Sequence, residues 1–260
     1  MGILNLTPDS FSDGGRFCHL DAALAHARRL IAEGADILDI GGESTRPGAA
    51  PLSEAEELAR VVPVIEAIGA QSDIPLSIDT MKPAVARAAV AAGATMWNDV
   101  TALRWTADSL AVAADLGCDM VLMHMQGEPA TMQAAPRYGD VVAEVVAFLA
   151  ARAAAAEGAG AARDKIWLDP GIGFGKTAAH SLTLLRGLGR LIELGYPVVL
   201  GASRKGFIRA VDPSAASPGD RLGASLAVAL AGARAGVAML RVHDVRETVQ
   251  ALAAQAALHD

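Results

Sequence analysis

The sequence has few aromatic residues and no excess of basic charge, and each shortage excludes a class of protein. Aromatic residues make up 4% of the 260 residues, whereas hydrophobic residues of all kinds make up 52%. Aliphatic residues and alanine must therefore form the core, which is typical of parallel strands covered by helices. The formal net charge is −7 and the basic residues do not form runs, which argues against nucleic acid as the main partner.

Cysteines and long apolar runs are also scarce. The two cysteines, Cys18 and Cys118, are far apart and lack metal-ligand spacing, which favours a cytoplasmic enzyme with reduced thiols. No apolar stretch reaches the roughly 18–20 residues that span a membrane. Residues 141–156 are rich in Ala and Val but contain Glu144 and Arg152, so we expect a surface helix there. We also expect no signal peptide, because the chain opens on an apolar strand pattern.

One pattern repeats along the chain: a short apolar run, a polar or glycine-rich loop, and an Ala-rich helical stretch. The expected strands end near Asn5, Asp39, Asp79, Asn98, Met123, Asp169, Gly201 and Arg241. Eight strand ends in 260 residues average roughly one per 32, the size of a βα unit. Alternating strands and helices imply a parallel sheet, and eight repeats favour a closed barrel. We therefore predict an α/β fold, a (β/α)8 TIM barrel that forms a single domain over residues 1–260.

Helix signals lie between the expected strands. The residues SEAE from Ser53 have the form of a capping box. Pro83 suits the first turn of a helix that Gly93 closes. Asp244, three residues before a glutamate, indicates another helix start directly after the last strand.

Polar residues gather at the expected strand ends, where a barrel of this kind carries its chemistry. The residues at or just after these ends are Asn5, Asp39, Asp79, Asn98, His124, Asp169, Ser203, Lys205, Arg241 and His243. A functional site at this end of the barrel is therefore predicted.

Three of these residues, Asp79, Asn98 and Asp169, come from different strands. Because a buried carboxylate is costly unless it is paired, they are expected to share a partner. Aspartate and asparagine together match a flat heterocycle with adjacent donors and acceptors, such as an aminopyrimidinone. The alternative is that each side chain caps neighbouring backbone.

Two basic motifs follow the last two strands. Ser203, Arg204 and Lys205 come after the seventh strand, a common position for a bound anion, and Lys205 can reach the barrel mouth. The alternative is solvated loop charge, more so for Arg204 than for Lys205. Arg241 and His243 are two residues apart, so alternation places both on one side, where they can bind an anion. The alternative is a helix-capping His243 beside a structural Arg241.

Two polar loops complete the expected site. The loop NLTPDSFSDGG follows the first strand, and we expect it to close over substrate. The amide oxygen of Asn5 suits Mg²⁺, which takes further ligands from water and substrate phosphates. The loop GGESTRPGA offers Thr45 and Arg46 to an anion or a carboxylate. His124 has no second histidine at metal spacing, so no zinc site is expected, and Met123 is expected to line the pocket.

In their order along the chain, these motifs resemble those of dihydropteroate synthases. NLTPDSFSDGG, ESTRPGA, SIDT, WNDV, LMHMQG, DPGIGFGK, SRK and RVHDV occur in the family's order between Asn5 and Val245. The resemblance implies a transferase of folate biosynthesis that condenses 6-hydroxymethyl-7,8-dihydropterin diphosphate with 4-aminobenzoate, giving 7,8-dihydropteroate and pyrophosphate. It also implies Mg²⁺ as cofactor, sulfonamides as inhibitors, and a cytoplasmic homodimer formed through the last helices, with no nucleic-acid or membrane partner.

The resemblance further implies roles for individual residues. The pterin would be bound by Asp79, Asn98, Met123, Asp169, Phe174, Gly201, Lys205 and Arg241. The diphosphate would be bound by Asn5, Thr45, Arg46, Arg241 and His243, with Mg²⁺ at Asn5. The aminobenzoate would be bound by Thr45, Pro47, Phe174, Ser203 and Lys205. The catalytic residues would be Asp9, Arg46 and Lys205.

Two other functions fit part of the pattern. A methyltetrahydrofolate-dependent methyltransferase of the pterin-binding barrels would share the Asp/Asn edge, but it has no need for the diphosphate set or for SRK. A non-catalytic pterin-binding barrel would be expected to lack the loop residues Asp9, Arg46 and Lys205, which are present. One departure from the resemblance is Trp97, which stands where an aliphatic residue is more usual.

Overall fold

The computed structural model describes residues 1–6, 16–44, 51–128 and 131–258, and the side chains of residues 16–19 are also outside the description. The strands are β1 (Gly2–Asn5), β2 (Leu38–Gly41), β3 (Leu76–Asp79), β4 (Met96–Asp99), β5 (Asp119–Met123), β6 (Ile166–Asp169), β7 (Val199–Leu200) and β8 (Met239–Leu240). The α-helices are α1 (Arg16–Ala32), α2 (Glu54–Gly69), α3 (Pro83–Ala91), α4 (Ser109–Leu116), α5 (Val141–Gly158), α6 (Ala178–Arg186), α7 (Leu188–Ile192), α8 (Leu222–Ala235) and α9 (Val245–Ala257). The short 3-10 helices are η2 (Arg163–Lys165), η3 (Gly206–Ala210) and η4 (Pro218–Arg221).

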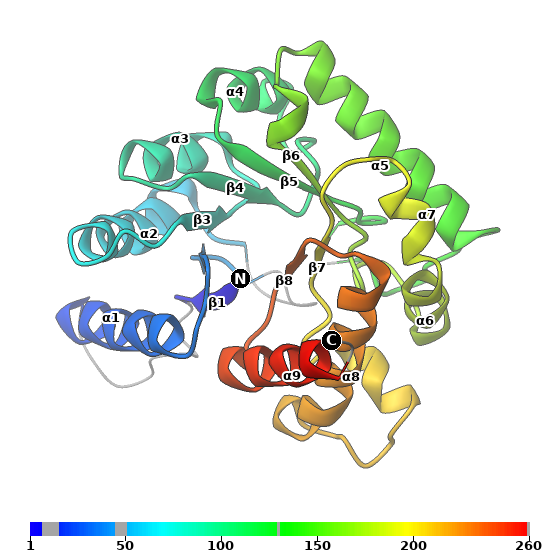
Figure 1. Cartoon of the computed structure of the whole chain (residues 1–260). Coiled ribbons are helices and arrows are strands. Elements are labelled where there is room, and N and C mark those ends of the chain that lie inside the picture. Colours follow the sequence, from blue (N-terminus) through cyan, green and yellow to red (C-terminus); the bar gives the residue numbers. More distant parts are fainter. Residues whose placement is uncertain (7–15, 45–50, 129–130, 259–260) are drawn as a thin grey trace.

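The strands form a ring of parallel neighbours. β1 to β6 pair in chain order, and β7 pairs with β8. Single parallel bridges join these two sheets on both sides, Leu168 with Val198 after β6 and Gly2 with Val242 beside β1. At the second junction Val242 N donates to Met1 O at 3.0 Å. The helices surround the strands (Figure 1), and at least one α-helix follows each strand, so the predicted (β/α)8 barrel is confirmed.

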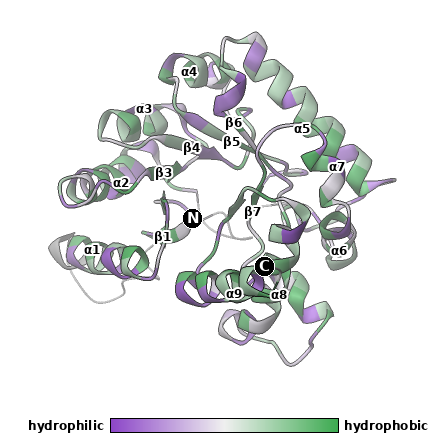
Figure 2. Ribbon diagram, viewed as in Figure 1, coloured by the Kyte–Doolittle hydropathy of each residue, from purple (hydrophilic) through white to green (hydrophobic). Residues whose placement is uncertain are grey.

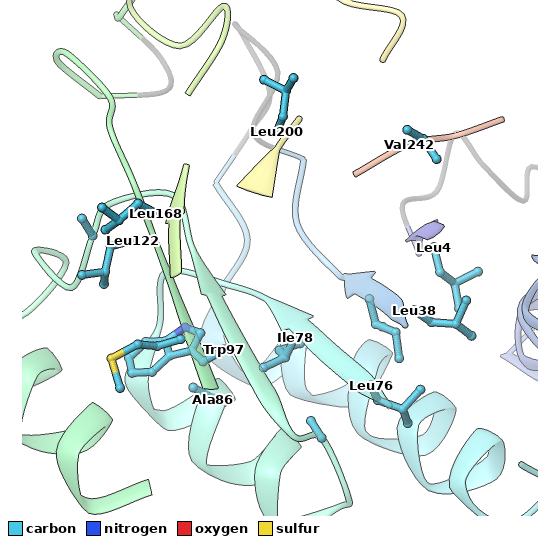
Figure 3. Close-up of a cluster of buried hydrophobic side chains, with 14 of the residues drawn as sticks. Leu4, Leu38, Leu76, Ile78, Ala86, Trp97, Leu122, Leu168, Leu200 and Val242 are labelled. Atoms are coloured by element: carbon cyan, nitrogen blue, oxygen red, sulfur yellow. The ribbon is translucent and has the colours of Figure 1, made fainter. Parts of the chain in front are cut away.

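The main hydrophobic core lies between the ring and the helices. Alternate strand residues point outward, and these are leucine, isoleucine and tryptophan side chains that are shielded from solvent. Figure 3 shows Trp97 of β4 close to Ala86 of α3, with Ile78 of β3 beside them. All three are 0% exposed. Hydrophilic and hydrophobic residues alternate along α1, α2 and α9 (Figure 2), as expected for helices with one face on the barrel and the other in solvent.

A second apolar cluster fills the end of the barrel where the strands begin. Its buried members are Met1, Ile37, Met96, Val121 and Val199, with Trp167 and Met239 packed against them. The residue two positions further along the same strand points to the same side. Because those residues are polar or glycine in most strands, the interior changes from an apolar floor to a polar layer at the carboxyl ends.

The helix signals of the sequence are confirmed. Ser53 Oγ accepts from Glu56 N at 3.3 Å, and Glu56 Oε2 accepts from Ser53 N at 3.0 Å, which is a complete capping box for α2. Pro83 is the first residue of α3, and Gly93 follows its C-cap. Asp244 occupies the N-cap position of α9 but makes no side-chain cap. Residues 141–156 lie in α5, as predicted.

The expected strand ends agree with the structure to within two residues. The largest difference is at Asp39, which is the second residue of β2 and not its last. Since β2 continues to Gly41, Asp39 lies one layer deeper in the barrel and is 0% exposed. None of the helices in the described ranges has both the length and the apolar character needed to cross a bilayer.

Replacement of Trp97 by phenylalanine is expected to destabilise the barrel. Trp97 Nε1 donates to the carbonyl oxygen of Thr80 at 2.8 Å, and both residues are buried. The Trp97→Phe variant leaves that carbonyl without its donor, so we expect the free energy of unfolding to fall by about 1–3 kcal/mol. Urea denaturation followed by far-ultraviolet circular dichroism measures this.

The matched control is Trp105→Phe, because Trp105 is 47% exposed. Its free energy of unfolding is expected to change by no more than about 0.5 kcal/mol. Equal denaturation midpoints for the two variants would contradict the expectation.

Candidate active site

Strand register puts four polar or small positions side by side at the mouth of the barrel. Asn5 of β1 pairs with Gly41 of β2, Gly41 with Asp79 of β3, and Asp79 with Asn98 of β4. Parallel strands in register carry equivalent positions to the same level, so these side chains form one row. The register therefore brings together Asp79 and Asn98, two of the three residues that are expected to share a partner.

Arg241 forms the centre of the polar layer. Its Nε donates to Asp39 Oδ2 at 2.6 Å, and one terminal nitrogen donates to Asp79 Oδ2 at 2.7 Å. Asn98 Nδ2 donates to the same oxygen of Asp39 at 3.0 Å. The guanidinium of Arg241, which follows β8, thus binds side chains of β2 and β3 across the interior of the barrel.

The charges in this cluster change one another's protonation. Burial alone would lower the pKa of Arg241, but Asp39 and Asp79 outweigh it and raise that pKa, so the guanidinium stays charged. Burial raises the pKa of Asp79 well above its ordinary value, and Arg241 offsets only part of the rise. Asp79 can therefore carry a proton near neutral pH and donate or accept a hydrogen bond.

Asp169 and Lys205 occupy the opposite side of the mouth. Asp169 is 5% exposed, its Oδ1 accepts from Gly171 N at 2.6 Å, and burial raises its pKa. A side chain on Gly201 would begin 3.6 Å from Asp169 Oδ2 and 3.8 Å from Arg241 Cδ, so Gly201 lies between these two charges. Burial, reinforced by Arg241, lowers the pKa of Lys205 to about 8, although Asp169 and Asp79 oppose the shift.

An apolar wall stands beside these charges. Lys205 Nζ lies 4.3 Å from the centre of the Phe174 ring and donates to Ile172 O. Phe174 packs on a cluster of buried residues made of Met81, Val100, Met123, Met125 and Met132. Phe174 and Met123 therefore share one apolar surface next to the polar row, which suits a flat ring with one polar edge.

Asn5 is the position expected to hold Mg²⁺. It is half-buried at the end of β1, and its Oδ1 lies 3.6 Å from where a side chain on Gly41 would begin. Asp79 Oδ2 is 3.7 Å from the same point. The described residues hold no group of three or more His, Cys, Asp or Glu side chains suited to a metal. An amide oxygen near a carboxylate fits Mg²⁺, which keeps several waters and binds substrate phosphates.

Ser203 and His243 form a pair after the last two strands. Ser203 Oγ lies 3.0 Å from His243 Nδ1 and accepts from His243 N at 3.2 Å. The N-cap of α9 is Asp244, so His243 does not cap that helix. Arg204 Nε donates to Asp244 Oδ2 at 2.9 Å and one terminal nitrogen donates to Asp244 Oδ1, so Arg204 is not simply a solvated loop charge.

Four predicted site residues, Asp9, Thr45, Arg46 and Pro47, lie outside the described residues. The structure also adds two residues to which sequence reasoning gave no role. Asp39, one of the predicted polar strand ends, is the second carboxylate of Arg241. Lys176, the last residue of the DPGIGFGK motif, is 3% exposed and donates to His124 Nδ1 at 2.8 Å. The sequence feature that could have singled out Lys176 is its position as the one charged residue at the end of the apolar, glycine-rich stretch GIGFGK.

Comparison with known proteins places this geometry in a family. The profile of the pterin binding enzymes matches residues 1–243. The chain belongs to the pterin-binding enzyme family. A dihydropteroate synthase of Escherichia coli K12 is 48% identical over 252 residues, which cover 97% of this chain and 88% of that protein.

Solved structures of family members superpose closely. A dihydropteroate synthase of Xanthomonas albilineans with 4-aminobenzoic acid has a TM-score of 0.93 and 53% identity, covering 100% of this chain and 92% of that one. A Yersinia pestis dihydropteroate synthase in complex with a sulfonamide drug has a TM-score of 0.93 and 46% identity, covering 100% and 93%. The pterin-binding barrel is thus shared along the whole chain.

Removal of Asp39 is expected to be costly. The Asp39→Ala variant leaves Arg241 with one carboxylate partner and deprives Asn98 of its acceptor. Breaking a buried ion pair from one side typically costs about 3–5 kcal/mol. We expect a loss of that size in the free energy of unfolding, measured by urea denaturation at pH 7.

Asp115→Ala is the control, because Asp115 pairs with Arg87 at the surface, with side chains 65% and 47% exposed. Loss of such a pair is expected to change stability by less than about 1 kcal/mol. If both variants lowered the free energy of unfolding by similar amounts, the Arg241 ion pairs would contribute no more to stability than a surface pair.

Proposed function

We propose that this chain is a dihydropteroate synthase. It joins 6-hydroxymethyl-7,8-dihydropterin diphosphate to 4-aminobenzoate and releases pyrophosphate. The observation that carries the proposal is the convergence of Asp79, Asn98, Asp169 and Lys205 around Arg241 at one end of a pterin-binding barrel. Named relatives along nearly the full length of the chain support the same activity.

The pterin would lie in the barrel mouth with its polar edge toward Asp79, Asn98 and Asp169. Ring nitrogens and the exocyclic amine donate to carboxylate oxygens, and the amide of Asn98 can both donate and accept. Met123 and Phe174 would cover the ring with their shared apolar surface. Gly201 leaves space between Asp169 and Arg241, and Arg241 would lie against the ring face.

The diphosphate would extend from the ring toward Asn5, Arg241 and His243, with Thr45 and Arg46 as further donors. Arg241 has a raised pKa and so offers a permanent positive charge to the leaving group. Asn5 would hold a Mg²⁺ ion, and such an ion neutralises the charge that develops on a departing diphosphate.

The aminobenzoate would bind closer to the surface, against Phe174, Ser203 and Lys205, with Thr45 and Pro47. The ammonium of Lys205 lies over the Phe174 ring and can attract a carboxylate or a developing charge. Asp9, Arg46 and Lys205 would be the catalytic residues, because each would touch a reacting group when both substrates are bound.

The reaction breaks the bond between the pterin methylene carbon and the diphosphate oxygen, and the electron pair leaves with the diphosphate. The positive charge at the methylene spreads into the pterin ring, whose edge faces the carboxyl groups of Asp79 and Asp169. The nitrogen of the arylamine forms the new bond to carbon and loses one proton to solvent. Since a neutral arylamine is already nucleophilic, positioning and electrostatic stabilisation suffice, without a covalent enzyme intermediate.

The biological setting is also part of the proposal. We infer that the chain works as a single domain, because its strand ring takes members from Gly2 to Val242. A cytoplasmic location agrees with the free thiol of Cys118, whose pKa burial raises. A homodimer through the last helices agrees with the small residues of α8 and with Val249 of α9, which is 42% exposed. Sulfonamides would inhibit by occupying the aminobenzoate position.

The activity is tested by pyrophosphate release from the pterin diphosphate, with and without 4-aminobenzoate and with Mg²⁺ or a chelator. We expect release that requires both 4-aminobenzoate and Mg²⁺, together with formation of 7,8-dihydropteroate detected by mass spectrometry. Absence of Mg²⁺-dependent release would refute the proposal.

Lys205→Ala is expected to raise the KM of both substrates, because Lys205 would contact both. We expect kcat/KM to fall by about 100-fold, the usual effect of losing one charged donor in an active site. Lys165→Ala is the control, since Lys165 is 41% exposed and pairs with Asp119 at the surface. Near-normal affinity and turnover in the Lys205 variant would contradict the assignment.

Activity is also expected to fall as the pH rises through about 8. The pKa of Lys205 is lowered to about 8, first by burial and then by Arg241. Below that pH the ammonium is charged, and above it the charge is lost. A profile of kcat/KM against pH reports the free enzyme, and the alkaline limb should move to higher pH in Lys205→Arg, because arginine stays charged. An unchanged limb in that variant would assign it to another group.

A further inference from the structure

The segment between β6 and Lys176 has an unusual backbone. Its glycines Gly171, Gly173 and Gly175 have φ values of +65°, +82° and +59°. A side chain on Gly171 would begin 1.9 Å from His124 O, and one on Gly175 would begin 2.3 Å from Gln126 O. The segment therefore packs backbone against backbone on the chain that leaves β5, in a conformation that L side chains rarely adopt.

Five consecutive carbonyls of this segment, from Gly171 to Gly175, each accept a hydrogen bond from a side chain. The donors are Lys176 to Gly171 at 2.9 Å and to Phe174 at 3.0 Å, Lys205 to Ile172, Gln133 to Gly173, and Tyr138 to Gly175 at 2.8 Å. Buried carbonyls outside regular secondary structure need such donors, because an unpaired one is costly. Four side chains from different parts of the sequence thus replace the backbone hydrogen bonds that a strand or helix would supply.

Lys176 has the largest share of these bonds. Its Nζ also donates to His124 Nδ1 at 2.8 Å and lies 3.2 Å from His124 O. Burial, and then Lys176, lowers the pKa of His124 to about 3, so the imidazole is neutral and its Nδ1 can accept. The described residues show no carboxylate within salt-bridge distance of Lys176. Carbonyl oxygens and one imidazole therefore surround the Nζ, and burial, reinforced by Lys205, lowers the pKa of Lys176 to about 7.

Lys176 and Lys205 approach the same short segment from different surroundings. Lys205 is half-buried beside Asp169 and the Phe174 ring, in the proposed site. Lys176 is 3% exposed, and its Nζ contacts His124 and the carbonyl oxygens of Gly171 and Phe174. A shift of the segment would move the Phe174 ring and the Ile172 carbonyl that receives Lys205 together. The segment thereby connects Lys176 to Phe174 and Lys205, the two residues at the proposed aminobenzoate position.

We propose that Lys176 is a positioning residue for the second substrate: the hydrogen bonds of its Nζ hold residues 171–175 in place, and so set where Phe174 and Lys205 meet the aminobenzoate. The inference rests on the proposed function for the identity of that substrate. Lys176 itself touches no substrate. Its removal should therefore weaken aminobenzoate binding by misplacement, while the pterin edge at Asp79 and Asn98 stays in register.

The main variant is Lys176→Met, which keeps the length of the side chain and removes its donors. We expect the KM for 4-aminobenzoate to rise about 10-fold or more, the effect of a misplacement of an ångström or less. The KM for the pterin diphosphate should also rise, because Phe174 and Lys205 would contact the pterin, but by less, because Asp79 and Asn98 lie on strands outside the segment. Lys165→Met is the matched control, because the same substitution there removes only a surface pair with Asp119. An unchanged KM for 4-aminobenzoate in a folded Lys176→Met variant would overturn the proposal.

A second variant separates position from general stability. Lys176→Ala leaves room for a small alkylammonium, so added ethylammonium should restore the KM for 4-aminobenzoate, whereas tetramethylammonium, which has no N–H donor, should not. If neither Lys176 variant folds, Tyr138→Phe and Gln133→Ala decide the question, since each removes one donor to the same segment. A smaller rise in the same KM in these variants supports the proposal, and no change in either overturns it.

Hydrogen exchange keeps the inference independent of the proposed activity. Amide exchange in a peptide that covers residues 170–176 should be faster in Lys176→Met than in the unchanged protein, with little change in β1 to β4. If the unchanged protein releases no pyrophosphate, the proposed function fails. Unaltered exchange of this peptide would separately contradict the role of Lys176 in holding the segment.

Discussion

The ion pairs between Arg241 and two aspartates inside the barrel are the interaction on which the rest of the site depends. Asp39 is fully shielded from solvent and Asp79 is half-buried, and both pair with the same cation. Arg241 supplies that cation from the end of the last strand, where it closes the ring beside β1. The same contact therefore joins distant parts of the chain and prepares a positive charge for an anionic leaving group.

The apolar floor makes this arrangement possible. Met96, Val121 and Val199 are buried inside the barrel where the strands begin, on the side of the polar layer away from the mouth. Charges in the layer interact through a medium of low polarity, which strengthens every interaction among them. The shifted pKa values of Asp79 and Lys205 are consequences of this placement. A polar layer above a packed floor thus supports both binding of a flat ring and stabilisation of developing charge.

The segment from Gly171 to Gly175 is shaped by a second constraint, which is close packing of backbone against backbone. The wall beside the ring must approach the backbone after β5 more closely than any side chain allows, so it is built of glycines with left-handed φ values. Such a segment has no ladder of its own and takes its hydrogen bonds from lysine, glutamine and tyrosine side chains. Site geometry here depends in part on Lys176, Gln133 and Tyr138, donors to which no ligand contact is assigned, in the way that outer residues orient the ligands of a metal.

Much of the fold followed from the order of residues alone. Apolar runs alternating with Ala-rich stretches gave eight βα units, because strand and helix patterns are local properties of the chain. The capping box at Ser53 and the proline at Pro83 marked helix starts for the same reason. The polar strand ends predicted which face carries the site, since parallel strands present their carboxyl ends together. The family resemblance then named the residues of that face.

Tertiary structure decided how those residues meet. Asp39 was among the polar positions, yet its role became visible only because β2 extends two residues further and Arg241 reaches it across the ring. Lys176 could not be assigned from its motif, because its partners at His124 lie 52 positions away in sequence. The sequence by itself determined the repeating units and the polar strand ends, which depend on local periodicity. The pairing of charges and the support of the glycine segment depend on closure of the ring, which brings together residues that no local pattern connects.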